Sequence, residues 1–200
     1  YEGRVTENDL PQKLGWIEVE LPTLFPDGPP VTARPCFPPG HFWVPPIGAG
    51  VWVEFAGGDP GSALWVGCFY GDGEVPPEAD KAPPSSRVLH TPAGHVVELA
   101  DEDGKERVII RHKENAFLAI DEDGSVVVSS ASGALLYLNA DKDEASVVSP
   151  QGHSVSLTGK GIALVHGDGK TTVEVKDGKV RLLANEITVA GNVVLGSAPV

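Results

Sequence analysis

Residues 91–138, TPAGHVVELADEDGKERVIIRHKENAFLAIDEDGSVVVSSASGALLYL, set the pattern of the second half of the chain. Short apolar runs alternate there with turns rich in Gly, Asp and Asn at intervals of about ten residues, and the alternation continues with shrinking intervals to Leu195. Pairs such as Asp103-Gly104 and Asp123-Gly124 favour hairpins, because the central residues of a tight hairpin turn must adopt positive φ. The pattern predicts about twelve short β-strands.

The apolar runs predicted to form these strands share a length of two to four residues and lie between the turn signals. They are residues 96–99, 108–110, 117–120, 126–128, 135–138, 147–148, 155–157, 162–165, 173–175, 180–183, 187–189 and 193–195.

The predicted strands need cover on one face. Val155-Ser156-Leu157 and Thr172-Val173-Glu174-Val175 alternate apolar with polar residues, so their apolar side chains share one side of a sheet. The chain contains no helical pattern that could cover that side, and its regular period favours a repeated, stacked unit. We therefore predict an all-β protein in which residues 91–195 form an intertwined triple-stranded β-helix of a homotrimer. A single-chain β-solenoid or a jelly roll is the alternative that the pattern leaves open.

Residues 1–70 have the pattern of a small barrel. The strands predicted there are residues 3–6, 15–21, 31–34, 50–55 and 63–68. Five strands, with clear alternation in the second and fourth, predict an OB-fold barrel. Residues 71–90 contain two Pro pairs and are predicted to be an extended linker, and residues 196–200 are predicted to be a C-terminal tail.

The barrel region also carries a resemblance to a known family. The matching residues are Gly3-Arg4-Val5, Asp9, Gly15, Val19, Leu21-Pro22, Ala33-Arg34, Pro45, Gly48, Val51, Val53, Phe55, Gly58-Asp59-Pro60 and Val66-Gly67. The most specific stretch is residues 45–71, PPIGAGVWVEFAGGDPGSALWVGCFYG, a hairpin with a tight Gly-Asp-Pro turn. In these residues the chain resembles the OB domain of contractile-tail central spike proteins, which include phage baseplate assembly protein V, the VgrG-like spike of type VI secretion and spikes of extracellular injection particles.

The resemblance implies a particular architecture and role. In that family a trimeric β-helix follows the OB domain, so the implied likeness spans nearly the whole chain, although only the first seventy residues match one by one. It implies a structural, membrane-piercing spike in a virion tail baseplate or an equivalent secreted contractile particle. The implied partners are two further copies of the chain, a baseplate hub protein at the OB domain, a PAAR-type tip protein at the C-terminal end and, transiently, the target cell envelope. The sequence lacks the lysozyme domain that larger phage spikes insert near the linker.

The charge of the chain argues against nucleic-acid binding. The formal net charge is −13, so a trimer would carry about −39 and would repel nucleic acids and anionic lipid head groups. Arg4, Lys13 and Arg34 are nearly the only cations of the barrel region, whereas single-strand binders present cations and aromatics along one groove. We predict that Trp52 and Trp65 pack within or against the barrel instead of binding a ligand.

Cys36 and Cys68 are the only cysteines, and we predict buried free thiols. The sequence contains no apolar run long enough to span a bilayer and no leader pattern. It also contains no Met, so we expect that it begins inside a longer product.

The sequence gives no pattern that predicts catalysis or metal binding. The six histidines are His41, His90, His95, His112, His153 and His166, and no two have the spacing of a metal site within one chain. His95, His153 and His166 lie beside Gly turns, so we predict that these three are exposed at corners. The acidic turns Asp101–Gly104 and Asp121–Gly124 fail the EF-hand pattern and are predicted to be solvated hairpin corners. There is no nucleophile elbow or phosphate-binding loop. We predict no catalytic, cofactor-binding or metal residues, no cofactor and no enzymatic activity.

Two other functions fit a trimeric rod. A tailspike that cleaves or binds surface polysaccharide would need a groove lined by aromatics and carboxylates, and paired carboxylates for glycoside hydrolysis remain open from sequence. The rod region offers only Phe117 and Tyr137 as aromatics. An adhesin would need a receptor-binding head, and the chain is expected to end bluntly at residues 196–200.

Overall fold

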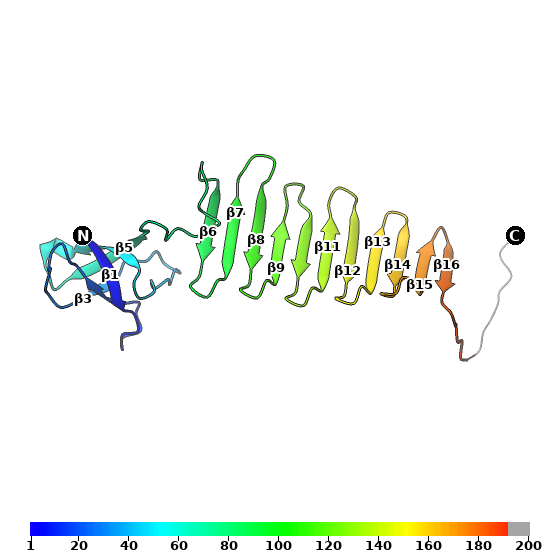
Figure 1. Ribbon diagram of the computed structural model, residues 1–200, viewed down its shortest axis with the longest axis horizontal. Coiled ribbons are helices and arrows are strands. Elements are labelled where there is room, and N and C mark those ends of the chain that lie inside the picture. The colour runs from blue at the N-terminus through cyan, green and yellow to red at the C-terminus, as the bar shows by residue number, and fades with distance from the viewer. Residues whose placement is uncertain (192–200) are drawn as a thin grey trace. The chain divides into compact units, whose positions relative to one another are not determined.

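The computed structural model describes residues 1–191 and contains sixteen β-strands and one short 3₁₀ helix within them (Figure 1). The strands fall into two compact units, of which the first ends at Asp80 and the second begins at Lys81. Over the described residues, no helix is long and apolar enough to cross a membrane. The all-β class predicted from the sequence is confirmed.

The first unit is a closed barrel with the strand order β1-β2-β3-β5-β4. Its strands are β1 Glu2–Glu7, β2 Ile17–Glu20, β3 Val31–Pro35, β4 Gly50–Phe55 and β5 Ala63–Phe69. Only β3 and β5 pair in parallel, and β1 closes the barrel by pairing with β4. The predicted barrel strands are therefore confirmed within one or two residues.

The barrel core consists of side chains that alternate along the strands. Its buried members are Val5, Ile17, Val19, Leu21, Ala33, Val51, Val53, Ala63 and Trp65. Trp65 donates its indole N–H to the Gly15 carbonyl at 3.0 Å, so its one polar atom is satisfied inside the core. Trp52 lies on the outer side of β4 against Phe69, with ring centroids 5.2 Å apart. The packing predicted for both tryptophans is confirmed.

The Gly-Asp-Pro turn joins β4 to β5, as predicted, through the 3₁₀ helix η1 (Ala56–Gly58). Asp59 organises it: its carboxylate accepts hydrogen bonds from the Gly61 N–H and the Ser62 hydroxyl, both at 2.9 Å. These hydrogen bonds lower the pKa of Asp59, and the bond from the Gly61 N–H has the larger effect.

The two cysteines differ from their prediction in one respect. Both are free, but both are exposed. The Cys68 side chain points out of the barrel, because side chains alternate along β5 and those of Ala63 and Trp65 point inward.

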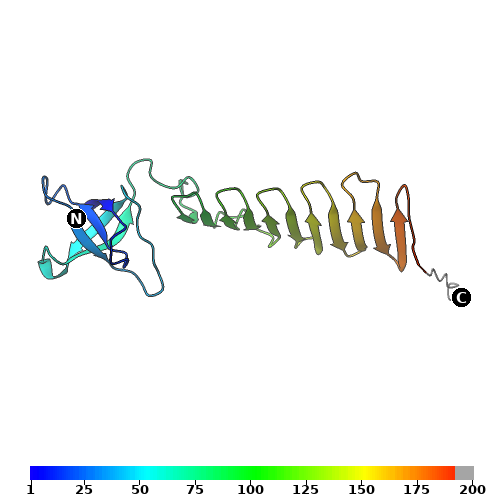
Figure 2. The ribbon, with the colours of Figure 1, turned by 90° about the horizontal axis from the view of Figure 1, so that it is seen from below.

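The second unit is an eleven-stranded antiparallel meander, which we call the ladder sheet. Figure 2 shows it as a single layer with no helix or second sheet stacked upon it. Its strands are β6 Ser86–His90, β7 Val96–Ala100, β8 Arg107–Arg111, β9 Phe117–Ile120, β10 Val126–Ser129, β11 Leu135–Asn139, β12 Glu144–Val148, β13 Ser154–Thr158, β14 Gly161–Val165, β15 Thr172–Lys176 and β16 Lys179–Leu183.

The strands of the ladder sheet pair in chain order within one chain. Every strand from β7 to β15 is hydrogen-bonded on both edges to its sequence neighbours in the same chain. Backbone groups of these strands are therefore already paired, and interchain strand pairing is open only at the outer edges of β6 and β16.

Two boundaries of the second unit also differ from prediction. The segment predicted as linker, residues 71–90, contains β6, which pairs with β7 along its whole length, because the Pro pairs end at Pro84 and leave Ser86 free to extend. The run Ile187–Val189 forms no strand. The preceding Ala184-Asn185-Glu186 has no glycine, whereas the earlier hairpin turns contain residues at positive φ. The predicted strand at residues 193–195 and the predicted tail at 196–200 lie outside the described residues.

Candidate interaction surface

One face of the ladder sheet is apolar across all eleven strands. Directly paired residues of an antiparallel sheet share a face, so the registers place side chains in continuous rows. The first row is Leu89, Val97, Ile110, Leu118, Val128, Leu136, Val147, Val155, Leu164, Val173 and Leu182. The second row begins at Arg87 and continues as Leu99, Val108, Ile120, Val126, Leu138, Ala145, Leu157, Ile162, Val175 and Val180. We call these two rows the apolar face.

Nothing in residues 1–191 covers the apolar face. Leu99 is 46% exposed, Ile110 51% and Leu182 51%, although side chains of this kind are normally buried. Removing the remaining area from water would gain on the order of 1 kcal/mol for each side chain. A continuous apolar surface of this extent marks an interaction surface.

The opposite face, which we call the mixed face, has a different composition. Its central row is Val88, Glu98, Ile109, Ala119, Val127, Tyr137, Ser146, Ser156, Ala163, Glu174 and Arg181. The row becomes polar toward the C-terminal strands, where Glu174 and Arg181 pair across β15 and β16 at 4.0 Å. The apolar face is therefore the one that sequence and chemistry single out for burial.

The mixed face holds one buried carboxylate, that of Glu98 on β7, whose side chain is 4% exposed. It accepts hydrogen bonds from Lys81 Nζ at 3.1 Å, Ser86 Oγ at 3.1 Å and Arg107 at 3.0 Å. Burial raises the pKa of Glu98, but the hydrogen bonds from Lys81 and Ser86 and the charge of Arg107 together outweigh burial, so the pKa is lowered. These contacts fix the segment that precedes β6 against the first strands of the sheet.

The turns along one edge of the ladder sheet share a geometry. In three of these turns, a side-chain oxygen of the first residue accepts the backbone N–H of the residue four positions later. In two of them, Thr91–His95 and Ser149–His153, the sequence is Thr/Ser-Pro-x-Gly-His, and Gly94 and Gly152 have φ of 92° and 84°. The Asp121–Ser125 turn uses the same bond on the other edge.

The two Thr/Ser-Pro-x-Gly-His turns each carry one member of a histidine pair. His95 packs on His112 with ring centroids 4.5 Å apart, and His153 packs on His166 at 4.4 Å. Nδ1 of His95 accepts a hydrogen bond from the backbone N–H of Lys113, and Nδ1 of His153 accepts one from the backbone N–H of Gly167. A neutral ring that accepts through Nδ1 carries its proton on Nε2, which leaves no free lone pair for a metal ion. Among residues 1–191, no three His, Cys, Asp or Glu side chains are grouped to hold a metal.

The sequence predicted His95, His153 and His166 to be exposed at turns, and of these His153 and His166 are exposed whereas His95 is half-buried. The sequence did not reveal how the histidines pair. His95 and His112, or His153 and His166, are adjacent only through the register of neighbouring strands, and the repeated Thr/Ser-Pro-x-Gly-His motif was the available signal. His41 and His90 are exposed. The Asp101–Gly104 and Asp121–Gly124 turns are exposed hairpin corners, as predicted; Asp101 pairs with Arg87 at 2.8 Å and Glu102 with Lys105 at 2.5 Å.

The two edges of the ladder sheet differ in charge. The histidine edge consists of the turns 91–95, 112–116, 130–134, 149–153 and 166–171. In these turns the charges of Lys113 and Lys170 balance those of Glu114 and Asp168, and the turns also contain four histidines. The acidic edge consists of the turns 101–106, 121–125, 140–143, 159–160 and 177–178. Its turns contain ten carboxylates, against the three lysines Lys105, Lys142 and Lys160.

The turns of the two edges also differ in length. Turns on the histidine edge keep five or six residues throughout, whereas turns on the acidic edge shorten from six to two toward β16 (Figure 1).

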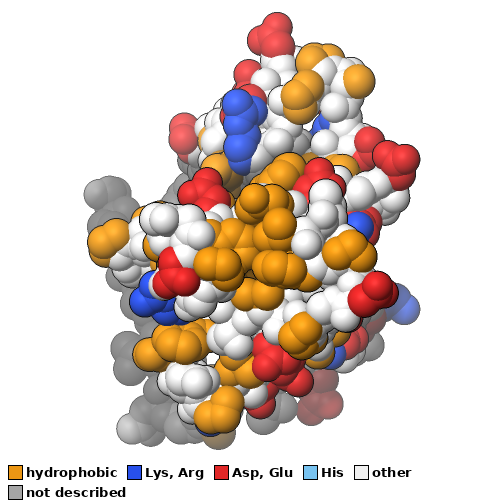
Figure 3. Space-filling view, turned by 90° about the vertical axis from the view of Figure 1, so that its left-hand side faces the viewer, with side chains coloured by type: hydrophobic (Ala, Val, Ile, Leu, Met, Phe, Trp, Pro, Cys, Tyr) orange, Lys and Arg blue, Asp and Glu red, His pale blue; other side chains and the backbone are white. Residues whose placement is uncertain are grey.

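The barrel unit exposes apolar side chains of its own. Phe42 is 63% exposed, Trp43 54% and Ile47 61%, all in the Pro-rich loop between β3 and β4. Figure 3 shows apolar side chains gathered at the centre of the view, with Asp and Glu side chains around them. Both observations fit a barrel that is in contact with other proteins.

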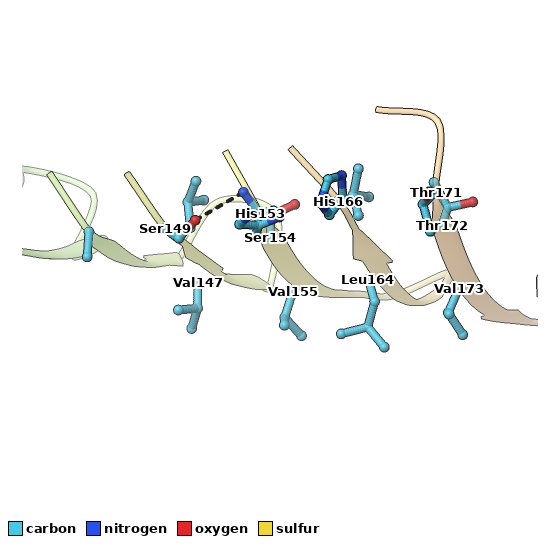
Figure 4. Close-up of a pocket in the computed structure, with 13 residues that line it drawn as sticks. Val147, Ser149, His153, Ser154, Val155, Leu164, His166, Thr171, Thr172 and Val173 are labelled. Carbon is cyan, nitrogen blue, oxygen red and sulfur yellow. Dashed lines mark hydrogen bonds between the residues drawn. The ribbon is translucent and has the colours of Figure 1, made fainter. Parts of the chain in front are cut away.

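A shallow trough of about 460 Å³ runs along the apolar face near the histidine edge. Figure 4 shows its two walls as diverging rows, an apolar row below and a polar row above. The apolar row is Val147, Val155, Leu164 and Val173, and the polar row is Ser149, His153, His166 and Thr171. The trough is open and carries no convergent set of charged groups, so it has the character of a packing surface.

The fold and these surfaces define an all-β protein with a closed barrel and a sheet that has one apolar face. Residues 1–70 match the family model of the type VI secretion system/phage-baseplate injector OB domain. No curated protein matches the chain. The barrel is thus similar to the injector OB domains of phage baseplates and type VI secretion systems, and this similarity supports a baseplate-associated structural role.

Proposed function

We propose that this protein is the central, membrane-piercing spike of a contractile tail or injection machine, that it acts as a homotrimer, and that it works without catalysis. The observation that carries the proposal is the apolar face, which spans all eleven strands of a sheet joined in one chain to an injector OB domain.

Three copies give the simplest cover for the apolar face. Each wall presents two apolar rows, so three walls enclose a narrow core that single Val, Ile and Leu side chains fill. Because the strands from β7 to β15 are paired within their own chain, the walls join mainly through side chains, in a three-walled β-prism. This refines the intertwined triple-stranded β-helix expected from the sequence.

A spike must resist force along its length instead of binding a substrate. Pulling one chain from the prism would expose its whole apolar face to water at once, because the two rows run without interruption from β6 to β16. The mixed face would point outward, and its charged pair Glu174 and Arg181 would keep the shaft hydrated during passage through the target cell envelope.

The proposed attachments lie at the two ends of the chain. The OB barrel binds a baseplate hub protein, and the exposed Phe42, Trp43 and Ile47 offer apolar contacts for that protein. A PAAR-type tip protein caps the C-terminal end of the prism. Nucleic acid is not a partner, because the net charge of −13 for each chain repels it.

The test is the solution mass of the purified chain by light scattering at neutral pH, repeated by electrophoresis in SDS without boiling. We expect a mass near three times 20.9 kDa that survives unboiled SDS. A monomer would refute the proposed spike and would require the apolar face to bind another partner.

A further inference from the structure

The two edges of the ladder sheet must meet some surface when the apolar face is buried. A ring of three identical walls related by a rotation axis along the ladder is heterologous: one edge of each wall contacts the opposite edge of the next wall. The two edges are chemically different, since the acidic edge carries an excess of carboxylates and the histidine edge carries balanced charges and two histidine pairs.

We propose that the acidic edge of each chain packs against the histidine edge of a second copy of this chain, at three equivalent corners. This inference rests on the proposed trimer and adds which surfaces form its contacts. It assigns the histidine pairs and the turns around them to the interface between chains, not to a metal site or to free surface.

The charges of the two edges favour the contact between unlike edges that rotation symmetry requires of three walls. The turns of the acidic edge, such as Asp101–Glu106 and Asp121–Ser125, are rich in carboxylates, and two such edges side by side would repel one another. The histidine edge has no net negative charge, and the Lys113 and Lys170 side chains of its turns can approach carboxylates. Contact between unlike edges therefore avoids the repulsion at every level.

The corner contacts can be specified along the ladder. The turn Asp101–Glu106 joins the same two strands, β7 and β8, whose other ends carry His95 and His112. Because rotation about an axis along the ladder keeps each strand at its own level, this turn of one chain lies between the levels of the β6–β7 and β8–β9 turns of the next chain, and the second of these contains Lys113.

Cysteine cross-linking of the full chain tests the inference. In a Cys36→Ser, Cys68→Ser background, the variant Asp103→Cys with Lys113→Cys is treated with a short bis-maleimide and separated in denaturing gels. Both substituted residues are exposed turn residues, and circular dichroism and light scattering before treatment check that each variant keeps its strands and its mass. We expect a covalent product of three chain masses, while Asp103→Cys alone and Lys113→Cys alone give only single chains.

The outcomes separate the inference from the proposed function. A solution mass of three chains with no cross-linked product in the double variant would overturn the corner contact and leave the trimer standing. Covalent dimers from Asp103→Cys alone would show that acidic edges meet, which also overturns it. A solution mass of one chain would refute the trimer, and the corner contact with it.

Discussion

The barrel and the ladder sheet use the same residue types and reach opposite states of burial. In the barrel, Val5, Ile17 and Val53 are at most 2% exposed, whereas Ile110 and Val147 of the ladder sheet are each 51% exposed. The barrel pairs β1 with β4 and so encloses an interior, but the ladder sheet ends in the unpaired edges of β6 and β16. A closed sheet supplies its own interior, and an open sheet of this kind needs other chains to supply one.

The strongest test of this difference places a charge on the apolar face. Val147→Glu costs little in a lone chain, because Val147 is half exposed, but in the trimer it would bury three carboxylates near the axis. We expect the mass by light scattering to fall from three chains to one. Ser146→Glu, one residue away on the mixed face, is the matched control and should keep the trimer mass; a Val147→Glu trimer would contradict the assignment of the faces.

For the barrel, the sensitive change is the removal of buried side-chain volume, which should lower its free energy of unfolding. Ile17 is fully buried, so Ile17→Ala removes contacts in a closed core and should lower the free energy of unfolding of the barrel by about 2–5 kcal/mol. Denaturant unfolding followed by tryptophan fluorescence measures it. Ile47→Ala, at a site 61% exposed, should change the same quantity by only about 0.5 kcal/mol or less, and equal losses for the two variants would contradict the barrel core.

The one buried carboxylate of the ladder sheet predicts a pH dependence. The pKa of Glu98 is lowered in the folded chain, so its stabilisation is present above the unfolded pKa of about 4.3 and is lost as pH falls through the lower folded value. Glu98→Gln should reduce the free energy of unfolding by about 1–3 kcal/mol at neutral pH, and the difference from wild type should vanish in acid. Thermal unfolding at several pH values measures this.

The control for that experiment is Glu174→Gln, which removes an exposed pair with Arg181 and should cost less than about 1 kcal/mol. A difference between wild type and Glu98→Gln that is unchanged in acid would show that the ionised carboxylate is not the stabilising form.

The smallest expected effect concerns the repeated turn of the histidine edge. Thr91→Ala removes the oxygen that accepts the His95 backbone N–H at 3.0 Å and should cost about 0.5–1.5 kcal/mol in unfolding free energy. Hydrogen exchange of the His95 amide should also quicken. Ser156→Ala, in the middle of β13, is the control, and an equal loss there would contradict the role of the turn.

Much of the fold could be predicted from the sequence because its signals are local. Asp-Gly turns and alternating runs located ten ladder strands and the five barrel strands. The prediction was wrong at β6, which lies in a segment whose Pro pairs indicated a linker. It was also wrong at residues 187–189, which form no strand, because no residue of the preceding 184–186 adopts the positive φ found in most of the earlier turns.

The candidate surface could be predicted only in outline. The alternation in Thr172-Val173-Glu174-Val175 indicates that one face is apolar, but the unbroken rows and the histidine pairs depend on register between strands. Register is set by turn geometry, which shifts with one inserted residue. The contact of Lys81 with Glu98 likewise joins residues that are seventeen positions apart, so no local sequence signal predicts it.

The shortening of the acidic-edge turns has a consequence for how such a shaft can be altered. Strand length stays at four or five residues from β7 to β16 while those turns decrease from six residues to two, so the width of the wall is adjusted outside the hydrogen-bonded part. The existing turns of six, five, four and two residues all leave the two apolar rows in phase. In the proposed prism, the outer girth can therefore decrease along the rod while the interior rows keep the same packing.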